Sequence, residues 1–366
     1  MRELIRANAG LLVAGVASFV LMGAGQSFYG PALPAFARAF GLSLPAAGVL
    51  ISAHWVGCAI GVAITFLAGP RITPRHALAP MVLGAAGIAT MAGWPATLLA
   101  AAVFGAGYGM ATAVFNPRVL AAFGRQGPSM LSFLNATFAV GAILSPLVFV
   151  ALGSDPRLGF GLTAVLAALV WLGSGAASRP VALTDGTTRP YRLHLPILAF
   201  GAVAIGIEAC LGGLGPAALI AAGHSEVSAA RHLSAFFLVF LAARMVLSFT
   251  AHRIPSFALY TFALGLTALC ALGAVLVHAG AFFVAMGAPA GLFFPGFYVT
   301  ASRKMGDDPR VPPTIIAAGL VGGILSPVVI GPAMAALGPL GFFWIVLGLS
   351  LAATLAALVS LRGMSR

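Results

Sequence analysis

The chain has 366 residues, of which 61% are hydrophobic and only 7% are charged. Soluble domains carry about 25% charged residues, so this composition excludes a soluble globular protein and indicates one whose surroundings are lipid. A net charge of +12 would suit a nucleic-acid binder in a soluble protein, but here the basic residues lie in short gaps between apolar runs, which argues against that function.

Apolar runs long enough to cross a bilayer, about 20 residues each, divide the first half of the chain. The first run continues past Tyr29, which is too long for a signal-peptide core, so we expect an uncleaved first span. The predicted spans of this half are 9–33, 45–68, 76–93, 95–121, 128–152 and 158–178.

The most polar stretch of the chain, 179–193, lies at its midpoint and is interpreted as a cytoplasmic linker. Six further spans are predicted at 194–221, 228–250, 256–277, 279–304, 311–336 and 338–362. The sequence therefore predicts an all-α membrane protein with twelve transmembrane helices. We expect two six-helix bundles, 1–178 and 194–366.

An internal repeat supports this division. The sequence VGAILSP at 140–146 recurs as VGGILSP at 321–327, an offset of 181 residues. Shorter matches at 30–32 with 215–217, and at 41–43 with 223–225, have offsets of 185 and 182. Parallel halves are the design of many secondary transporters, in which the substrate site lies between the repeats. We expect Gly141 and Gly322 to permit close packing against the opposite half.

The distribution of positive charge predicts the orientation. With both termini in the cytoplasm, all but three of the 19 Lys and Arg residues fall on cytoplasmic loops or helix ends. The exceptions are Arg38, Arg157 and Arg231. Because cytoplasmic loops carry an excess of Lys and Arg, we expect a multi-pass protein of the inner membrane with both termini in the cytoplasm.

Twelve spans, a 6+6 duplication and a central linker resemble the major facilitator superfamily over essentially the whole chain. Within it, three stretches are similar to the fucose/glucose-galactose porter group: FYGPALP at 28–34, LNATFAVGA at 134–142 and GIE at 206–208. The resemblance implies alternating access by two bundles, a small-molecule substrate and a monomer in the bilayer.

The loop between the second and third spans departs from the family pattern. Arg71 and Arg75 match its basic positions, but Pro70 stands where the family carries an Asp that helps to latch the cytoplasmic gate. Arg118 and Arg244 lie toward the cytoplasmic ends of their spans. We interpret all four arginines as candidate gating residues. For Arg118 and Arg244, snorkelling to the interface or binding of the substrate are the alternatives.

Glu208 is the acidic residue that falls near the centre of a predicted span. A charge there costs on the order of 3 kcal/mol, so such residues usually face a cavity or a partner. Glu208 is predicted either to couple protons or bond the substrate, or to be a structural carboxyl that is protonated or paired with an arginine such as Arg244.

Other polar and aromatic side chains inside the spans are candidates for lining a substrate cavity, because in lipid each polar group needs an inward partner. Bonds between helices are the alternative role. The candidates, beside Glu208, are Gln26, His54, Trp55, Tyr108, Asn116, Asn135 and Tyr298. The three cysteines have no metal-like spacing, and no nucleotide loop is present, so we expect no metal, no cofactor and no enzyme.

The favoured function is a secondary transporter of a small, polar, sugar-like solute, coupled to protons. A proton-antiport exporter of amphipathic compounds is the alternative, because polar cavity candidates are few. A uniporter, and a lipid-handling or assembly protein on the same fold, also fit the sequence.

Overall fold

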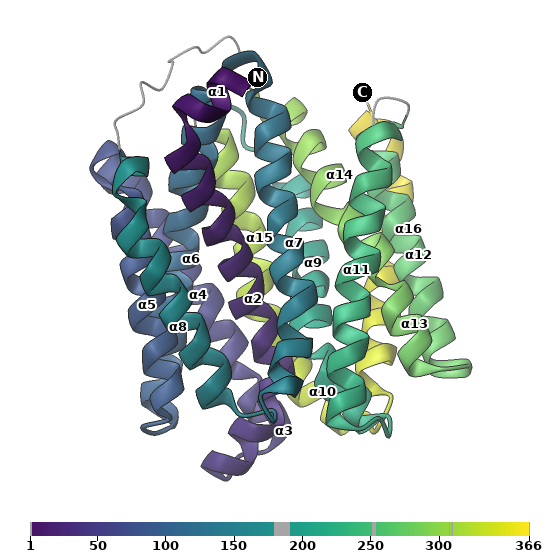
Figure 1. The fold of residues 1–366 in the computed structure, drawn as a ribbon. Helices are drawn as coiled ribbons and strands as arrows, with labels where there is room; N and C mark the ends of the chain where they lie inside the picture. Colours follow the sequence, from purple (N-terminus) through teal and green to yellow (C-terminus); the bar gives the residue numbers. More distant parts are fainter. Residues whose placement is uncertain (1, 179–190, 251–253, 307, 309, 366) are drawn as a thin grey trace. The chain divides into compact units, whose positions relative to one another are not determined.

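The computed structural model describes residues 2–178, 191–250, 254–306, 308 and 310–365, and every regular element in these residues is a helix (Figure 1). The chain divides into two compact units. Unit 1 comprises Met1–Leu42 and Ala53–Asp185, and unit 2 comprises Ser43–Ser52 and Gly186–Arg366. The predicted linker, 179–193, lies largely outside the described residues.

The helices up to residue 178 are α1 (Arg2–Ala7), α2 (Ala9–Phe40), α3 (Leu44–Ala47), α4 (Val49–Ala68), α5 (Pro74–Thr90), α6 (Trp94–Ala122), α7 (Gly127–Ala151) and α8 (Pro156–Gly173), with short 3₁₀ turns η1 (Gly69–Arg71), η2 (Gly124–Gln126) and η3 (Ser174–Ser178). The later helices are α9 (Leu195–Gly213), α10 (Gly215–Ala221), α11 (Glu226–Thr250), α12 (Ser256–Leu276), α13 (Ala279–Ala285), α14 (Gly287–Met305), α15 (Val311–Ala336) and α16 (Gly341–Ser365).

Among the described residues, eleven helical segments are long and apolar enough to cross a membrane. The remaining predicted span, 76–93, corresponds to α5, whose 17 residues extend about 26 Å at 1.5 Å per residue. A hydrocarbon core is about 30 Å thick, so α5 falls slightly short of it.

Two predicted spans are broken by proline. The span 194–221 is divided into α9 and α10 at Leu214, and the span 279–304 into α13 and α14 at Met286. Pro216 and Pro289 follow these breaks within three residues. Since proline has no N–H, neither can bond the carbonyl four residues earlier, and this missing bond favours an interruption.

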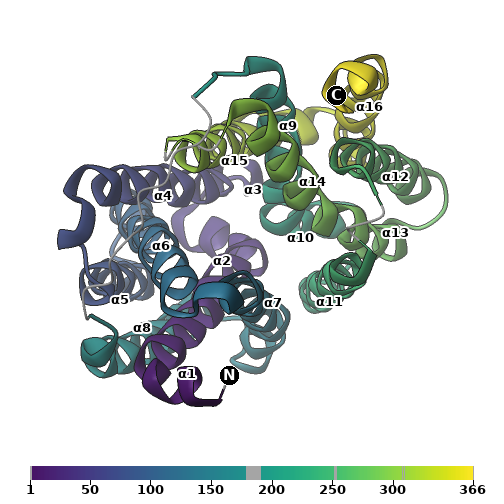
Figure 2. The ribbon, with the colours of Figure 1, turned by 90° about the horizontal axis from the view of Figure 1, so that it is seen from above.

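The same helix pairs pack in both units (Figure 2). In unit 1, α2 packs on α7, and α5 packs on both α6 and α8. In unit 2, α9 packs on α15, and α12 packs on both α14 and α16. Each pair in unit 2 joins the counterparts of the helices paired in unit 1, as a duplication requires.

Glycine contacts give the register of the two copies. A Cβ on Gly141 would overlap the carbonyl oxygen of Val20, and a Cβ on Gly322 would overlap that of Ala202. In each unit, therefore, the fifth span approaches the backbone of the first at one glycine. The expectation that Gly141 and Gly322 face the opposite half was wrong, because their nearest neighbours are the first helix of their own unit.

A second pair of helices shows the same register. Gly105 on α6 lies against the carbonyl of His54, and Gly287 on α14 lies against that of Phe236. Gly109 and Gly291, one turn later, meet the carbonyls of Cys58 and Phe240. The partners in each copy are separated by 182 residues: Val20 and Ala202, Gly105 and Gly287, Gly109 and Gly291, His54 and Phe236, Cys58 and Phe240.

Candidate substrate and proton site

His54 lies at the centre of an aromatic cluster in unit 1 and is 0% exposed. Its ring centroid lies 5.2 Å from Tyr29, 5.3 Å from Trp55 and 5.2 Å from Tyr108. Phe104 closes another side at 5.7 Å. The glycine contact described above holds α4 against α6 at this level, which is why His54 on α4 meets Tyr108 on α6. Three of the predicted site residues, His54, Trp55 and Tyr108, are therefore brought together.

One ring nitrogen of this cluster and two polar side-chain atoms of α2 are buried without a hydrogen-bond partner. The His54 Nδ1 atom lies 3.4 Å from the Tyr29 hydroxyl, but its Nε2 atom has no partner. On α2, Gln26 Oε1 and Ser27 Oγ are also buried and unpartnered. Leaving such an atom unsatisfied costs about 1–3 kcal/mol, so these atoms mark positions where a bound polar ligand would be stabilised.

Asn116 and Asn135 join α6 to α7. The Asn135 Nδ2 group donates to the Asn116 Oδ1 atom at 3.4 Å and to the carbonyl of Leu131 at 2.9 Å. The predicted pair is thus brought together, and its amides already have partners. This arrangement favours the bond between helices that the sequence left as the alternative role.

Arg118 ties α6 to the loop that carries the family's basic pattern. Its Nη1 group donates to the carbonyl of Val114 at 3.2 Å, and its Nη2 group donates to the carbonyl of Ile72 at 3.0 Å. Its Nε atom is buried without a partner. Arg118 therefore restrains the Gly69–Arg71 turn, which suits a gating or structural role.

The other two candidate gating residues of unit 1 lie at its surface. Arg71 is exposed at the end of η1. Arg75, also exposed, donates from Nη2 to the carbonyl of Leu172 at 3.3 Å and lies 6.0 Å from the ring centroid of Trp171. Arg75 therefore joins the start of α5 to the end of α8.

Glu208 and Arg244 are the charged side chains of the unit 2 site. Glu208 lies on α9, and its Oε2 atom is buried without a hydrogen-bond partner. Arg244 lies on α11. The Arg244 Nε group donates to the carbonyl of Gly291 at 3.1 Å, and its guanidinium lies 4.3 Å from the ring centroid of Phe240. A carboxyl whose buried oxygen has no hydrogen-bond partner can accept and release a proton.

Tyr298, the last predicted cavity residue, lies on α14 beside Phe294, with ring centroids 5.3 Å apart. Its position corresponds to Asn116 of unit 1, since the residue numbers differ by 182. By the same register, Gln26 corresponds to Glu208. At these two helix positions, therefore, both units carry a candidate residue, although the residue types differ.

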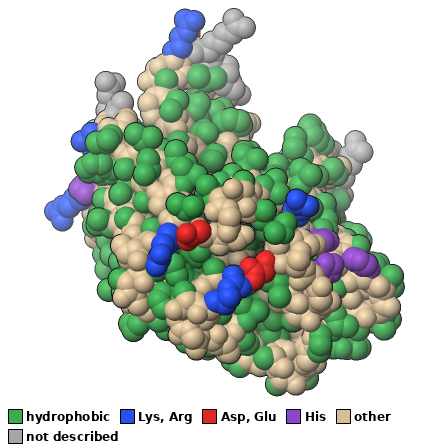
Figure 3. Space-filling view, turned by 60° about the horizontal axis from the view of Figure 1, so that its bottom comes forward, with side chains coloured by type: hydrophobic (Ala, Val, Ile, Leu, Met, Phe, Trp, Pro, Cys, Tyr) green, Lys and Arg blue, Asp and Glu red, His purple; other side chains and the backbone are tan. Residues whose placement is uncertain are grey.

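Sequence reasoning missed a cluster of three histidines in unit 2. The ring centroid of His224 lies 5.0 Å from His232 and 5.7 Å from His278. Figure 3 shows histidine side chains gathered on one face of the molecule. The Nδ1 group of His232 lies 2.7 Å from the Ser228 carbonyl, and the Nδ1 atom of His278 accepts from the Ala281 N–H at 3.1 Å. Only the folded chain brings these positions together, so their spacing gave no signal.

The pKa of His224 is lowered from its ordinary value by burial and then by His232 and His278. A histidine with a lower pKa in the folded state binds its proton more weakly there than in the unfolded chain. Its stabilising contribution is therefore complete above about pH 6.5 and is lost as the pH falls toward the lowered pKa. We expect the melting temperature of purified protein to fall by a few degrees between neutral and mildly acidic pH, and His224→Gln to reduce that fall. An equal fall in the variant would assign the pH dependence elsewhere.

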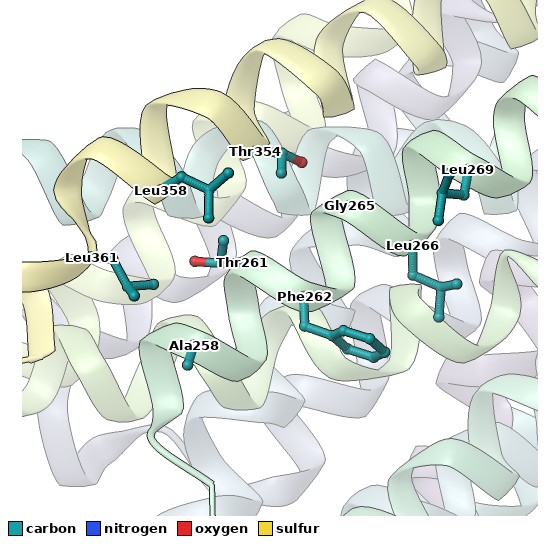
Figure 4. Close-up of a pocket in the computed structure, with 9 residues that line it drawn as sticks. All are labelled: Ala258, Thr261, Phe262, Gly265, Leu266, Leu269, Thr354, Leu358 and Leu361. Carbon is teal, nitrogen blue, oxygen red and sulfur yellow. The ribbon is translucent and has the colours of Figure 1, made fainter.

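A depression of about 530 Å³ between α12 and α16 is not a candidate for the polar site (Figure 4). Its lining is mostly Leu, Phe and Ala, and the hydroxyls of Thr261 and Thr354 are bonded to the carbonyls of Phe257 and Ser350 on their own helices. No polar side chain of this depression is left to recognise a solute.

Comparison with known proteins agrees with this architecture. The sequence profile of the Major Facilitator Superfamily matches residues 15–311, while no curated protein matches the chain significantly. The structure is similar to a D-xylose-proton symporter with a TM-score of 0.77 and 17% identity, covering 95% of this chain and 96% of that one.

Two other solved structures extend the comparison. A peptide transporter POT has a TM-score of 0.78 and 14% identity, covering 98% of this chain and 95% of that one. The fucose:proton symporter FucP of E. coli has a TM-score of 0.64 and 18% identity, covering 97% and 98%. At these identities the likeness shows the fold. It confirms the predicted all-helical transporter fold, and the chain belongs to the Major Facilitator Superfamily, as a multi-pass membrane transporter and not an enzyme.

Proposed function

We propose that the chain carries a small, polar, sugar-like solute across the inner membrane by alternating access, coupled to protons through Glu208. The observation that carries this proposal is the buried Oε2 atom of Glu208, which has no hydrogen-bond partner. A proton on Glu208 neutralises a costly charge in the membrane, so proton binding and release can be linked to movement of the two halves, 1–178 and 194–366.

The lining groups support a neutral polar solute. Trp55 and Tyr108 offer ring faces for stacking, and Gln26 offers a hydrogen-bonding atom without a partner. Two of the similar solved structures are described as sugar–proton symporters, for xylose and for fucose. These names support the sugar class, and the fucose name agrees with the porter-group resemblance of the sequence.

Uptake by purified protein in proteoliposomes tests the proposal. We expect labelled D-xylose or L-fucose to accumulate when the pH outside is lower than inside, and accumulation to stop when a proton ionophore collapses the gradient. Uridine and dialanine serve as solutes of other classes. Uptake of either one in place of both sugars would overturn the sugar class, and uptake unaffected by the ionophore would overturn proton coupling.

The orientation of the chain gives a separate prediction. Because most Lys and Arg residues fall on one side, we propose that both termini and the 179–193 linker lie in the cytoplasm. The native thiols of Cys58, Cys210 and Cys270 are buried, so a Thr187→Cys variant has little background. We expect a membrane-impermeant maleimide to label it only after permeabilisation. Labelling in intact cells would reverse the topology.

A further inference from the structure

The duplicated packing provides an internal comparison between the two units. Gly105 and Gly287 make the same backbone contact in the two copies, and so do Gly109 and Gly291. Residues of the first, second and fourth spans that this packing requires should therefore recur 182 positions apart. When a polar or bulky side chain occurs in one copy only, the other copy shows that the shared packing forms without it. The presence of that side chain therefore calls for a functional reason.

The candidate site residues differ sharply between the copies. His54 and Trp55 on α4 correspond to Phe236 and Phe237 on α11, and Tyr108 on α6 corresponds to Ala290 on α14. Unit 1 thus has imidazole, indole and phenol groups where unit 2 has phenyl rings and a methyl group. Conversely, Arg244 of unit 2 corresponds to Val62 of unit 1, and Glu208 corresponds to Gln26.

The buried atoms without hydrogen-bond partners show the same asymmetry. Over the part of the chain that the structure describes, those of unit 1 are Gln26 Oε1, Ser27 Oγ, His54 Nε2, Arg118 Nε, Gln126 Oε1 and Ser145 Oγ. In the described part of unit 2, one side-chain atom is buried without a hydrogen-bond partner, and it is Glu208 Oε2. Each such atom needs an explanation in a membrane interior, and the His54 Nε2 atom belongs to a ring that contacts the aromatic rings of Trp55 and Tyr108.

Resting on the transport function proposed above, we propose that the units divide the work: unit 1 recognises the substrate through Trp55, Tyr108 and Gln26, and unit 2 supplies the protonated group, Glu208. His54 is a positioning residue. It is completely buried behind Trp55 and Tyr108, which are partly exposed, and its ring contacts both.

Exchange of substrate between the two sides of a proteoliposome, without a pH gradient, tests this division, because exchange requires substrate binding but no net proton movement. The variants Trp55→Phe and His54→Phe copy the residues of unit 2 into the same packing, so both are expected to fold. We expect the KM for exchange to rise at least about tenfold, which corresponds to roughly 1.4 kcal/mol of lost binding, with kcat changed by less than about threefold.

The matched control is Phe237→Leu, which removes a ring from the corresponding position of unit 2 and should leave KM within about twofold. His54→Gln keeps a hydrogen-bonding group behind Trp55 and Tyr108 and should recover part of the affinity lost in His54→Phe. Melting temperatures of all variants identify any that are misfolded. Trp55→Phe and His54→Phe with the KM of wild type, or Phe237→Leu with an equally raised KM, would overturn the division.

The same assay separates this inference from the proposed function. The probes are D-xylose, L-fucose, uridine and dialanine. If wild type exchanges only uridine or dialanine, the sugar class fails, while the KM values of the variants for that solute still decide where recognition lies. If wild type exchanges none of the four, both proposals are overturned.

Discussion

Replacing Glu208 by glutamine is expected to abolish substrate accumulation driven by a pH gradient while leaving the protein folded and inserted. Glutamine keeps the shape and hydrogen-bonding capacity of the side chain but cannot bind and release a proton. It also stands naturally at the corresponding position of unit 1, Gln26, in the same packing of the first span against the fifth. The measurement is accumulation of D-xylose or L-fucose in proteoliposomes with an imposed pH gradient, compared with the melting temperature of each preparation.

Exchange without a gradient separates two roles for Glu208. If this residue only carries the proton, Glu208→Gln should exchange substrate with a KM within about twofold of wild type. If it also bonds the substrate, exchange should be lost together with accumulation. A variant that accumulates substrate as well as wild type would show that Glu208 is a structural carboxyl. Proton coupling would then have to reside elsewhere, with His54 the next residue to test.

Much of the fold could be predicted because its determinants are local. Long apolar runs bounded by polar residues specify membrane helices, and eleven of the twelve predicted spans are long, apolar helices among the described residues. The helix breaks at Leu214 and Met286 were not predicted, although Pro216 and Pro289 carried their signal. Both prolines follow within three residues of the break, so the missing N–H falls well inside an otherwise continuous apolar run.

The candidate site was harder to predict because its geometry depends on contacts between helices. The residue types of His54, Trp55 and Tyr108 suggested that they line a substrate cavity, but only the packing of α4 on α6 shows that they form one cluster. The histidines at 224, 232 and 278 meet for the same reason and had no local pattern. The partner of Gly141 was wrongly assigned because a small residue predicts a close approach without specifying which helix approaches.

The internal repeat connects the local sequence pattern with the contacts between helices. The recurrence of VGAILSP as VGGILSP could be read from the sequence, but its physical cause is visible only in the structure. The glycine in each copy lies against a backbone carbonyl of the first span in the same unit. A motif that appeared to mark an interface between halves therefore marks the internal packing of each half.

Leucine at Gly141 or Gly322 is expected to prevent stable folding, because the close approach at each glycine is to backbone atoms. A Cβ on Gly141 would overlap the carbonyl of Val20, and one on Gly322 would overlap that of Ala202. Backbone carbonyls inside two packed helices cannot move aside as a flexible side chain can, so the helix pair must separate. Overpacking a core commonly costs about 1–3 kcal/mol and occasionally more, and the overlap with backbone places these variants at the upper end.

The control is Gly348→Leu on α16, since a Cβ there meets nothing within 4 Å. We expect Gly348→Leu to give the yield and melting temperature of wild type, and Gly141→Leu and Gly322→Leu to give little monodisperse protein. Similar losses from both sites would show that the two halves depend on the same contact. A stable Gly141→Leu protein would mean that α2 and α7 do not pack at this glycine in the membrane.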